Sequence, residues 1–177
     1  MEFTLIYITS QILTIGMYGL LALSYYLKSR SKILIANFLG SILIAVALLL
    51  LEAYTGAAMA LIAIIRNFIF LIDEKKNGKV DKIKSKDVLI LVVILLMIVL
   101  AAIPTFTSTL SLLPVLATSI FTFSIWQKKK IVYKVLGVPV SILWIVYSIY
   151  IATLFGIILE VIVLLFIISS LIQRKSK

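Results

Sequence analysis

The chain of 177 residues is 63% hydrophobic and 14% charged, with a mean hydropathy of +1.24 and a net charge of +10. Apolar residues make up only about half of an ordinary soluble domain, so this composition favours a membrane protein. The chain has no Cys and no His, which excludes disulfides, thiolate or imidazole metal sites and histidine acid–base chemistry.

Seven apolar stretches are long enough to cross a membrane, for which a helix needs about 20 mostly apolar residues. The sequence therefore predicts an all-α membrane protein with seven transmembrane helices. In chain order, the predicted spans are about Phe3 to Leu27, Ile33 to Leu51, Gly56 to Ile72, Val88 to Ile103, the stretch that follows Pro104 and Thr105 to Thr109 and ends near Trp126, Ile131 to Ile151, and Phe155 to Ile172.

The Lys and Arg residues indicate the orientation of these spans. All of them except Arg66 lie at 28–32, 75–86, 128–134 and 174–177, after the first, third, fifth and seventh spans. By the positive-inside rule, these clusters place the N-terminus outside and the C-terminus in the cytoplasm. They predict contact with anionic lipid headgroups rather than with nucleic acid. Asp87, just before the fourth span, is expected to cap that helix.

An internal repeat appears when the sequence is shifted by 100 residues. The shift aligns Ser24 with Ser124, Lys28 with Lys128 and Gly56 with Gly156, at span ends and turns. Two three-helix units separated by one helix insert with the same orientation, related by an axis along the membrane normal. The predicted organisation is a first three-helix repeat at 1–72, a cytoplasmic charged loop at 73–87, a linker transmembrane helix at 88–104 and a second three-helix repeat at 105–177.

This 3+1+3 layout is similar to that of the SWEET and PQ-loop proteins and the nicotinamide riboside carriers, although the proline–glutamine signature of the PQ-loop group is missing. A closer resemblance rests on three stretches: "AYTGAAMALIAIIRNFIF", "WQKKK" and "SILWIVYSIYIATLFGIILE". These stretches resemble the bacterial YgjV-type inner-membrane family over nearly the whole chain. The resemblance implies a multi-pass protein of the bacterial inner membrane and specifies architecture more than function.

Two ionisable residues lie well inside predicted spans, where each costs about 2.5 to 3.5 kcal/mol at the helix centre. Arg66 lies seven residues before Asp73. From there its side chain could snorkel to the interface, or it could face the interior and bind a substrate or a carboxylate. Glu160 is the candidate partner. Its carboxyl group could carry a proton in a proton-coupled carrier, or it could be neutral and hydrogen-bonded to a neighbouring helix.

Other polar and aromatic side chains lie at central depths. Asn37 is at a depth near that of Arg66, where a hydrogen bond between them would satisfy both groups. Some of these groups could contact a ligand, and the alternative is packing between helices. Pro114 and Pro139 are expected to interrupt backbone hydrogen bonds within the fifth and sixth spans. The candidate substrate-binding residues are Gln11, Asn37, Ser41, Arg66, Asn67, Trp144, Tyr147, Ser148 and Glu160.

These features predict a small-molecule transporter that works by alternating access between two three-helix bundles. The alternative is a non-transporting membrane protein that serves assembly or docks a partner. An intramembrane enzyme is not expected, because no His, Cys or Asp lies within a span. The expected partners are the bilayer and a small polar solute, with no metal, no cofactor and no nucleic acid. The oligomeric state stays open.

Overall fold

The computed structural model describes residues 2–77, 85–106 and 108–175. Within these ranges there are seven long α-helices and no strand, and all seven helices are long and apolar enough to cross a membrane. The predicted all-α, seven-span fold is therefore confirmed. The helices are α1 (Glu2–Tyr26), α2 (Arg30–Leu50), α3 (Tyr54–Asn77), α4 (Ser85–Thr105), α5 (Leu112–Trp126), α6 (Lys130–Tyr150) and α7 (Leu154–Lys175), and a 3₁₀ turn, η1 (Thr109–Ser111), precedes α5.

Two features of the structure differ from the sequence prediction. The predicted charged loop at 73–87 is partly helical, because α3 continues to Asn77 and α4 begins at Ser85. Pro114 is the third residue of α5. The first turn of a helix has no intrahelical partner for its N–H groups, so a proline there removes no hydrogen bond. The expected interruption at Pro114 is wrong, whereas Pro139 does lie inside α6.

Two tight turns connect α2 to α3 and α6 to α7 with the same backbone geometry. Glu52 and Ala152 have φ values of 56° and 53°, in the left-handed region. Ala53 N–H donates to the Leu48 carbonyl at 2.9 Å, and Thr153 N–H donates to the Ser148 carbonyl at 3.0 Å. This 6→1 bond closes a Schellman motif, which satisfies carbonyls at the end of a helix and reverses the chain.

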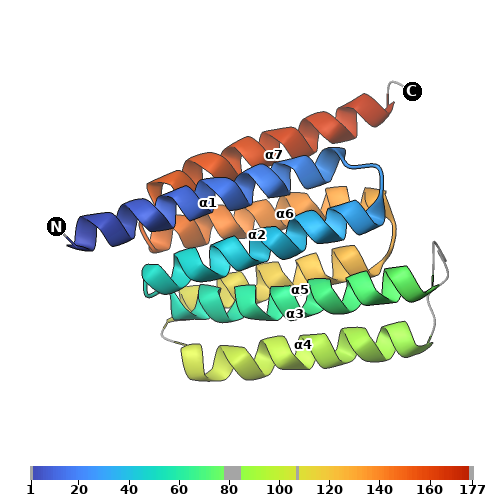
Figure 1. The fold of residues 1–177 in the computed structure, drawn as a ribbon, viewed down its shortest axis with the longest axis horizontal. Coiled ribbons are helices and arrows are strands. Elements are labelled where there is room, and N and C mark those ends of the chain that lie inside the picture. The colour runs from blue at the N-terminus through green and yellow to red at the C-terminus, as the bar shows by residue number, and fades with distance from the viewer. Residues whose placement is uncertain (1, 78–84, 107, 176–177) are drawn as a thin grey trace.

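Six of the helices form a closed ring, and α4 lies outside it. Around the ring, α1 packs on α2, α2 on α3, α3 on α5, α5 on α6, α6 on α7, and α7 on α1. Helix α4 packs against α3 and α5, at one edge of the molecule (Figure 1). We call the end of the bundle with Arg30, Lys86 and Lys128 the basic end, and the end with the 51–53 and 151–153 turns the turn end.

Helix boundaries recur at a spacing of 100 residues. Helices α2 and α6 begin at Arg30 and Lys130, and α3 and α7 begin at Tyr54 and Leu154. The two largest contacts between the halves are α3 with α5 and α1 with α7, and a shift of 100 residues exchanges one of these contacts for the other. A shift of 100 residues therefore aligns the starts of α2 and α6, the starts of α3 and α7, and the two tight turns.

Candidate functional site

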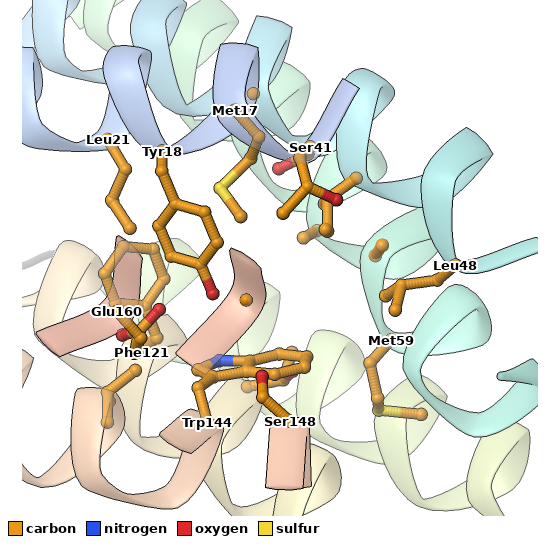
Figure 2. Close-up of a pocket in the computed structure, with 18 of the residues that line it drawn as sticks. Met17, Tyr18, Leu21, Ser41, Leu48, Met59, Phe121, Trp144, Ser148 and Glu160 are labelled. Carbon is orange, nitrogen blue, oxygen red and sulfur yellow. The ribbon is translucent and has the colours of Figure 1, made fainter. Parts of the chain in front are cut away.

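The ring encloses a cavity with a volume of about 120 Å³. All six ring helices contribute lining residues, and α4 contributes none. Figure 2 shows side chains from both halves pointing into the space, among them Tyr18, Ser41, Trp144 and Glu160. An apolar cavity of about 150 Å³ holds benzene, so this one suits a ligand of a few non-hydrogen atoms.

Arg66 lies at the interior of the bundle and does not reach either end. Its side chain is 1% exposed and lines the cavity. The Nη1 atom donates to Thr122 Oγ1 on α5 at 3.0 Å, and Nε and Nη2 both donate to Asn67 Oδ1 at 3.2 Å. The guanidinium also lies over the Phe121 ring, 5.2 Å from its centroid, in a cation–π contact. Of the two orientations open from the sequence, the structure shows the interior one.

The partners of Arg66 are themselves held in place. Asn67 Nδ2 donates to Ser41 Oγ on α2 at 3.1 Å, and Thr122 Oγ1 donates to the Thr118 carbonyl at 2.7 Å. A chain of hydrogen bonds thus links α2, α3 and α5 in the middle of the bundle. Asn37 does not form the hydrogen bond with Arg66 that the sequence left open. Its amide donates to Tyr133 Oη on α6 at 3.3 Å and to the Ile33 carbonyl at 2.8 Å.

Glu160 lies on α7 and is 2% exposed. Its hydrogen-bonding neighbours are the side chains of Tyr18 on α1 and Ser141 on α6, and Figure 2 shows the Tyr18 hydroxyl directed towards it. Within the described ranges, the ion pairs involve other residues, so the candidate ion pair between Glu160 and Arg66 is not formed. The two groups line the same cavity at separate points.

Three candidates on α6 contribute an aromatic and hydroxyl-bearing wall. Trp144, Tyr147 and Ser148 all line the cavity. The rings of Trp144 and Tyr147 meet edge to face, with centroids 5.7 Å apart. Ser148 approaches the Tyr18 hydroxyl from this wall. The arrangement places polar atoms and an aromatic face around one small volume, as ligand pockets usually do.

Two candidates lie outside the lining. Asn67 is fully buried behind Arg66, where it acts as the acceptor described above. Gln11 is 4% exposed, and its Nε2 donates to Ser10 Oγ at 3.2 Å. Among the described residues, Gln11 Oε1 has no hydrogen-bond partner. The remaining seven candidates line the cavity: Asn37, Ser41, Arg66, Trp144, Tyr147, Ser148 and Glu160.

Aromatic residues close the cavity towards the basic end. Tyr25 stacks on Tyr133 with centroids 4.9 Å apart, and Phe121 lies 5.5 Å from Tyr133. The Tyr133 hydroxyl bonds Ser24 Oγ at 2.7 Å. Gly137 makes this packing possible, because a Cβ there would lie 2.7 Å from the Tyr25 hydroxyl.

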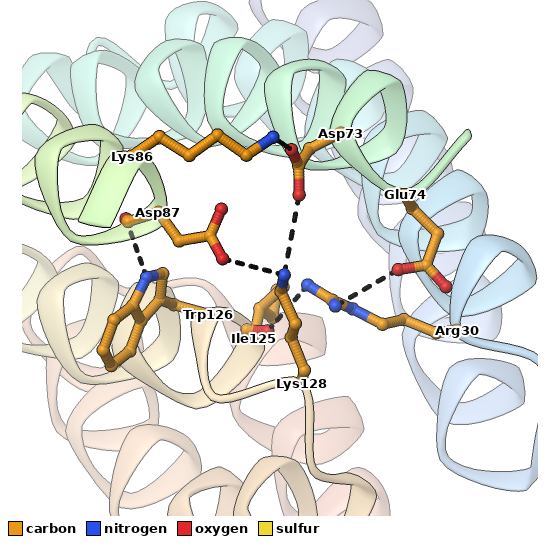
Figure 3. Close-up of polar contacts among 8 residues, drawn as sticks. All are labelled: Arg30, Asp73, Glu74, Lys86, Asp87, Ile125, Trp126 and Lys128. Atoms are coloured by element: carbon orange, nitrogen blue, oxygen red, sulfur yellow. Dashed lines mark hydrogen bonds and ion pairs between the residues drawn. The ribbon is translucent and has the colours of Figure 1, made fainter. Parts of the chain in front are cut away.

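Ion pairs link helix ends at the basic end (Figure 3). Lys128 Nζ lies 2.9 Å from Asp87 Oδ2 and 3.7 Å from Asp73 Oδ2, and so joins α3 and α4 to the end of α5. Arg30 Nη1 pairs with Glu74 Oε2 at 3.2 Å. Asp87 was expected to cap α4, but the helix begins two residues earlier, and this carboxylate instead faces Lys128.

Several lining residues were missed by the sequence reading, including Tyr18, Phe121 and Ser141. Ser141 had a usable signal, since it aligns with Ser41 at the shift of 100 residues. Tyr18 aligns with Thr118, which also lines the cavity. Phe121 had none, because a phenylalanine in an apolar span is indistinguishable from one that faces lipid.

The comparisons with known proteins agree with this architecture. The family Imp-YgjV, described as bacterial inner membrane protein, matches residues 8–177. No curated protein and no solved structure matches the chain. The match covers nearly the whole sequence, and seven helices in the described ranges can cross a membrane. The chain therefore belongs to the Imp-YgjV family and is a multi-pass protein of the bacterial inner membrane.

Proposed function

We propose that this protein transports a small solute across the inner membrane by alternating access. The observation that carries the proposal is the cavity, which is enclosed by both halves of the ring and lined by the buried side chains of Arg66 and Glu160. Ionisable residues inside a membrane are costly and usually mark a pathway or a binding site. The two moving bodies are α1–α3 and α5–α7, and α4 is the linker.

The recurrence of helix boundaries at 100 residues supports this division into bodies. Transporters built from parallel repeats place the substrate at the interface of the repeats, near the middle of the membrane. The larger helix contacts between the halves are α3 with α5 and α1 with α7. The Tyr133 hydroxyl on α6 adds hydrogen bonds to Ser24 and Asn37 in the first half, so a rocking motion must also break these. Each three-helix body keeps its own internal packing during that motion.

The direction in which the cavity faces follows from its lining. Leu51, Ile151 and Thr153 extend the lining to the turns at the turn end, whereas aromatic rings and ion pairs close the basic end. If the basic end is cytoplasmic, as the positive-inside rule implies, this conformation is closed to the cytoplasm and directed towards the periplasm. Transport then requires the aromatic layer and the ion pairs to separate.

Reconstitution in liposomes tests the proposal. Vesicles that contain the wild-type protein are loaded with a panel of labelled polar metabolites. Efflux is compared with that from protein-free vesicles loaded in the same way. We expect accelerated movement of at least one solute, lost in Arg66→Gln and altered in Glu160→Gln. Val161→Ala is the control for α7, because Val161 is 41% exposed and lies beside Glu160 in the sequence. The proposal would be contradicted if no solute left these vesicles faster than it leaves protein-free vesicles.

A further inference from the structure

We infer that the cavity binds a small carboxylate with an apolar body, and that Arg66 holds the carboxylate. This inference names the substrate class of the proposed transporter and so rests on the proposed function. It draws on four features: the partners of Arg66, the rigidity of its surroundings, the volume of the cavity and the character of its lining.

The charge of Arg66 has no counter-ion within the described part of the chain. Its contacts there are an amide oxygen, a hydroxyl and the face of a phenyl ring, all of them neutral. A guanidinium has five N–H donors. Three are used in these hydrogen bonds, which leaves two N–H groups without an acceptor among the described residues. A buried charge without a partner is strongly unfavourable. An anionic ligand would supply the missing counter-charge and accept hydrogen bonds from the remaining N–H groups.

The guanidinium is held in one orientation before any ligand arrives. Asn67 fixes one edge and Thr122 fixes Nη1, and each of these two residues is anchored by a further hydrogen bond. The Phe121 ring supports one face. Arginine binds carboxylates in a planar, two-pronged geometry that a rigid guanidinium favours. A hydroxyl group would use only part of that geometry and would bring no compensating charge.

The rest of the cavity suits an apolar body of limited size. Most of the lining is apolar, and Met17, Leu48 and Met59 reach into the space (Figure 2). The volume of about 120 Å³ is too small to hold a whole disaccharide or nucleotide. A pocket with an apolar wall and few polar groups selects a ligand of the same pattern.

A cationic ligand is the principal competitor, with Glu160 as its partner. The Glu160 carboxyl group already has Tyr18 and Ser141 as hydrogen-bonding neighbours from two helices. Arg66 lines the same cavity, so its charge would repel a cation there. The geometry therefore favours an anion over an amine, and the two can be compared directly.

The experiment measures ligand binding to the full-length protein in lipid nanodiscs by isothermal titration calorimetry. The probes are butanoate and 3-methylbutanoate, their neutral amides, and butylamine. We expect each carboxylate to bind at least about tenfold more tightly than its amide, and butylamine to show no measurable binding. Equal affinity for carboxylate and amide, or tighter binding of the amine, would overturn the inference.

Variants locate the site. Arg66→Gln should lower carboxylate affinity at least about tenfold, and Arg66→Lys should lie between it and the wild type, because lysine keeps the charge without the two-pronged geometry. Lys129→Gln is the matched control, since this exposed lysine lies at the basic end. Unchanged carboxylate affinity in Arg66→Gln would place the ligand elsewhere. If Arg66→Gln fails to fold, the comparison of carboxylate with amide on the wild type still decides.

Flux in liposomes separates this inference from the proposed function. If carboxylates bind but never cross the vesicle membrane, the binding site is supported and the proposed transport is contradicted. If a neutral solute crosses and no carboxylate binds, the proposed transport is supported and the carboxylate site is contradicted.

Discussion

At the basic end, ion pairs join α2 to α3 and join α5 to α3 and α4, and a layer of tyrosine and phenylalanine rings closes the cavity towards this end. At the turn end, the links between helices are neutral. Thr55 Oγ1 donates to the Thr105 carbonyl, and Ser108 Oγ bonds the Tyr150 hydroxyl at 3.1 Å. The cavity lining reaches the turn end and stops short of the basic end. The closed end of the bundle is thus the one with the stronger cross-links.

The difference shows that charge serves two purposes in this molecule. Charges at the basic end find partners close to the water interface, where they fix helix ends at moderate cost. Arg66 and Glu160 lie deeper and have neutral partners within the described residues. We therefore expect the basic end to contribute more to stability than the turn end, whereas Arg66 and Glu160 line the cavity.

Among the variants that compare the two ends, Lys128→Met should lower the free energy of unfolding most. It removes the cation between Asp73 and Asp87 and leaves two neighbouring carboxylates. Removing one partner of a buried pair costs about 3 kcal/mol. We expect a loss of about that size in the free energy of unfolding, measured in mixed micelles. Lys129→Met, the adjacent exposed lysine, should change stability little. Equal losses in the two variants would show that the ion pairs of Lys128 are not the source of the stability.

Gly137→Ala should disturb the aromatic layer that closes the cavity towards the basic end. The new Cβ would lie 2.7 Å from the Tyr25 hydroxyl and 3.1 Å from Ile167 Cδ1, so the Tyr25 side chain or one of the packed helices must shift. Overpacking of this kind costs about 1 to 3 kcal/mol. Gly19→Ala is the control, because a Cβ at that position meets nothing within 4 Å. Thermal unfolding of both variants checks the prediction, and a Gly137→Ala midpoint equal to that of Gly19→Ala would contradict it.

Thr55→Val tests the turn end, where it removes the hydroxyl that bonds the Thr105 carbonyl. A neutral hydrogen bond contributes about 1 kcal/mol, so the loss should be about a third of that in Lys128→Met. The readout is again the free energy of unfolding in mixed micelles. A loss as large as that in Lys128→Met would mean that the two ends are equally strong.

Arg66→Gln should have the smallest effect on stability, although it removes ligand binding. Glutamine can still donate a hydrogen bond in place of the guanidinium, and the variant buries no charge. We expect the free energy of unfolding without ligand to stay within about 0.5 kcal/mol of the wild type, or to rise. A loss comparable with that in Lys128→Met would assign Arg66 a structural role instead.

Much of the fold was predictable from sequence, because long apolar runs separated by charged or polar turns leave few alternatives. Helix ends such as Arg30 and Lys130 fall where the apolar pattern begins. The direction of single side chains was less accessible. Thr122, the partner of Arg66, is 56 residues away on α5, and only the packing of α3 against α5 brings them together. Asn37 lay at the predicted depth, but its rotation about α2 directs it to Tyr133.

The bonds from Arg66 to Asn67 also bear on how the protein enters the membrane. Helix α3 precedes α5 in the chain, so when the helices insert in order Arg66 enters the bilayer before Phe121 and Thr122 do. Asn67, the next residue, accepts from two nitrogens of the guanidinium and arrives with it. We expect Asn67 to lower the cost of inserting α3 before the second half is made. Glycosylation-mapped insertion of a truncated chain that ends after α3 measures this, and Asn67→Leu should insert less efficiently despite being more apolar.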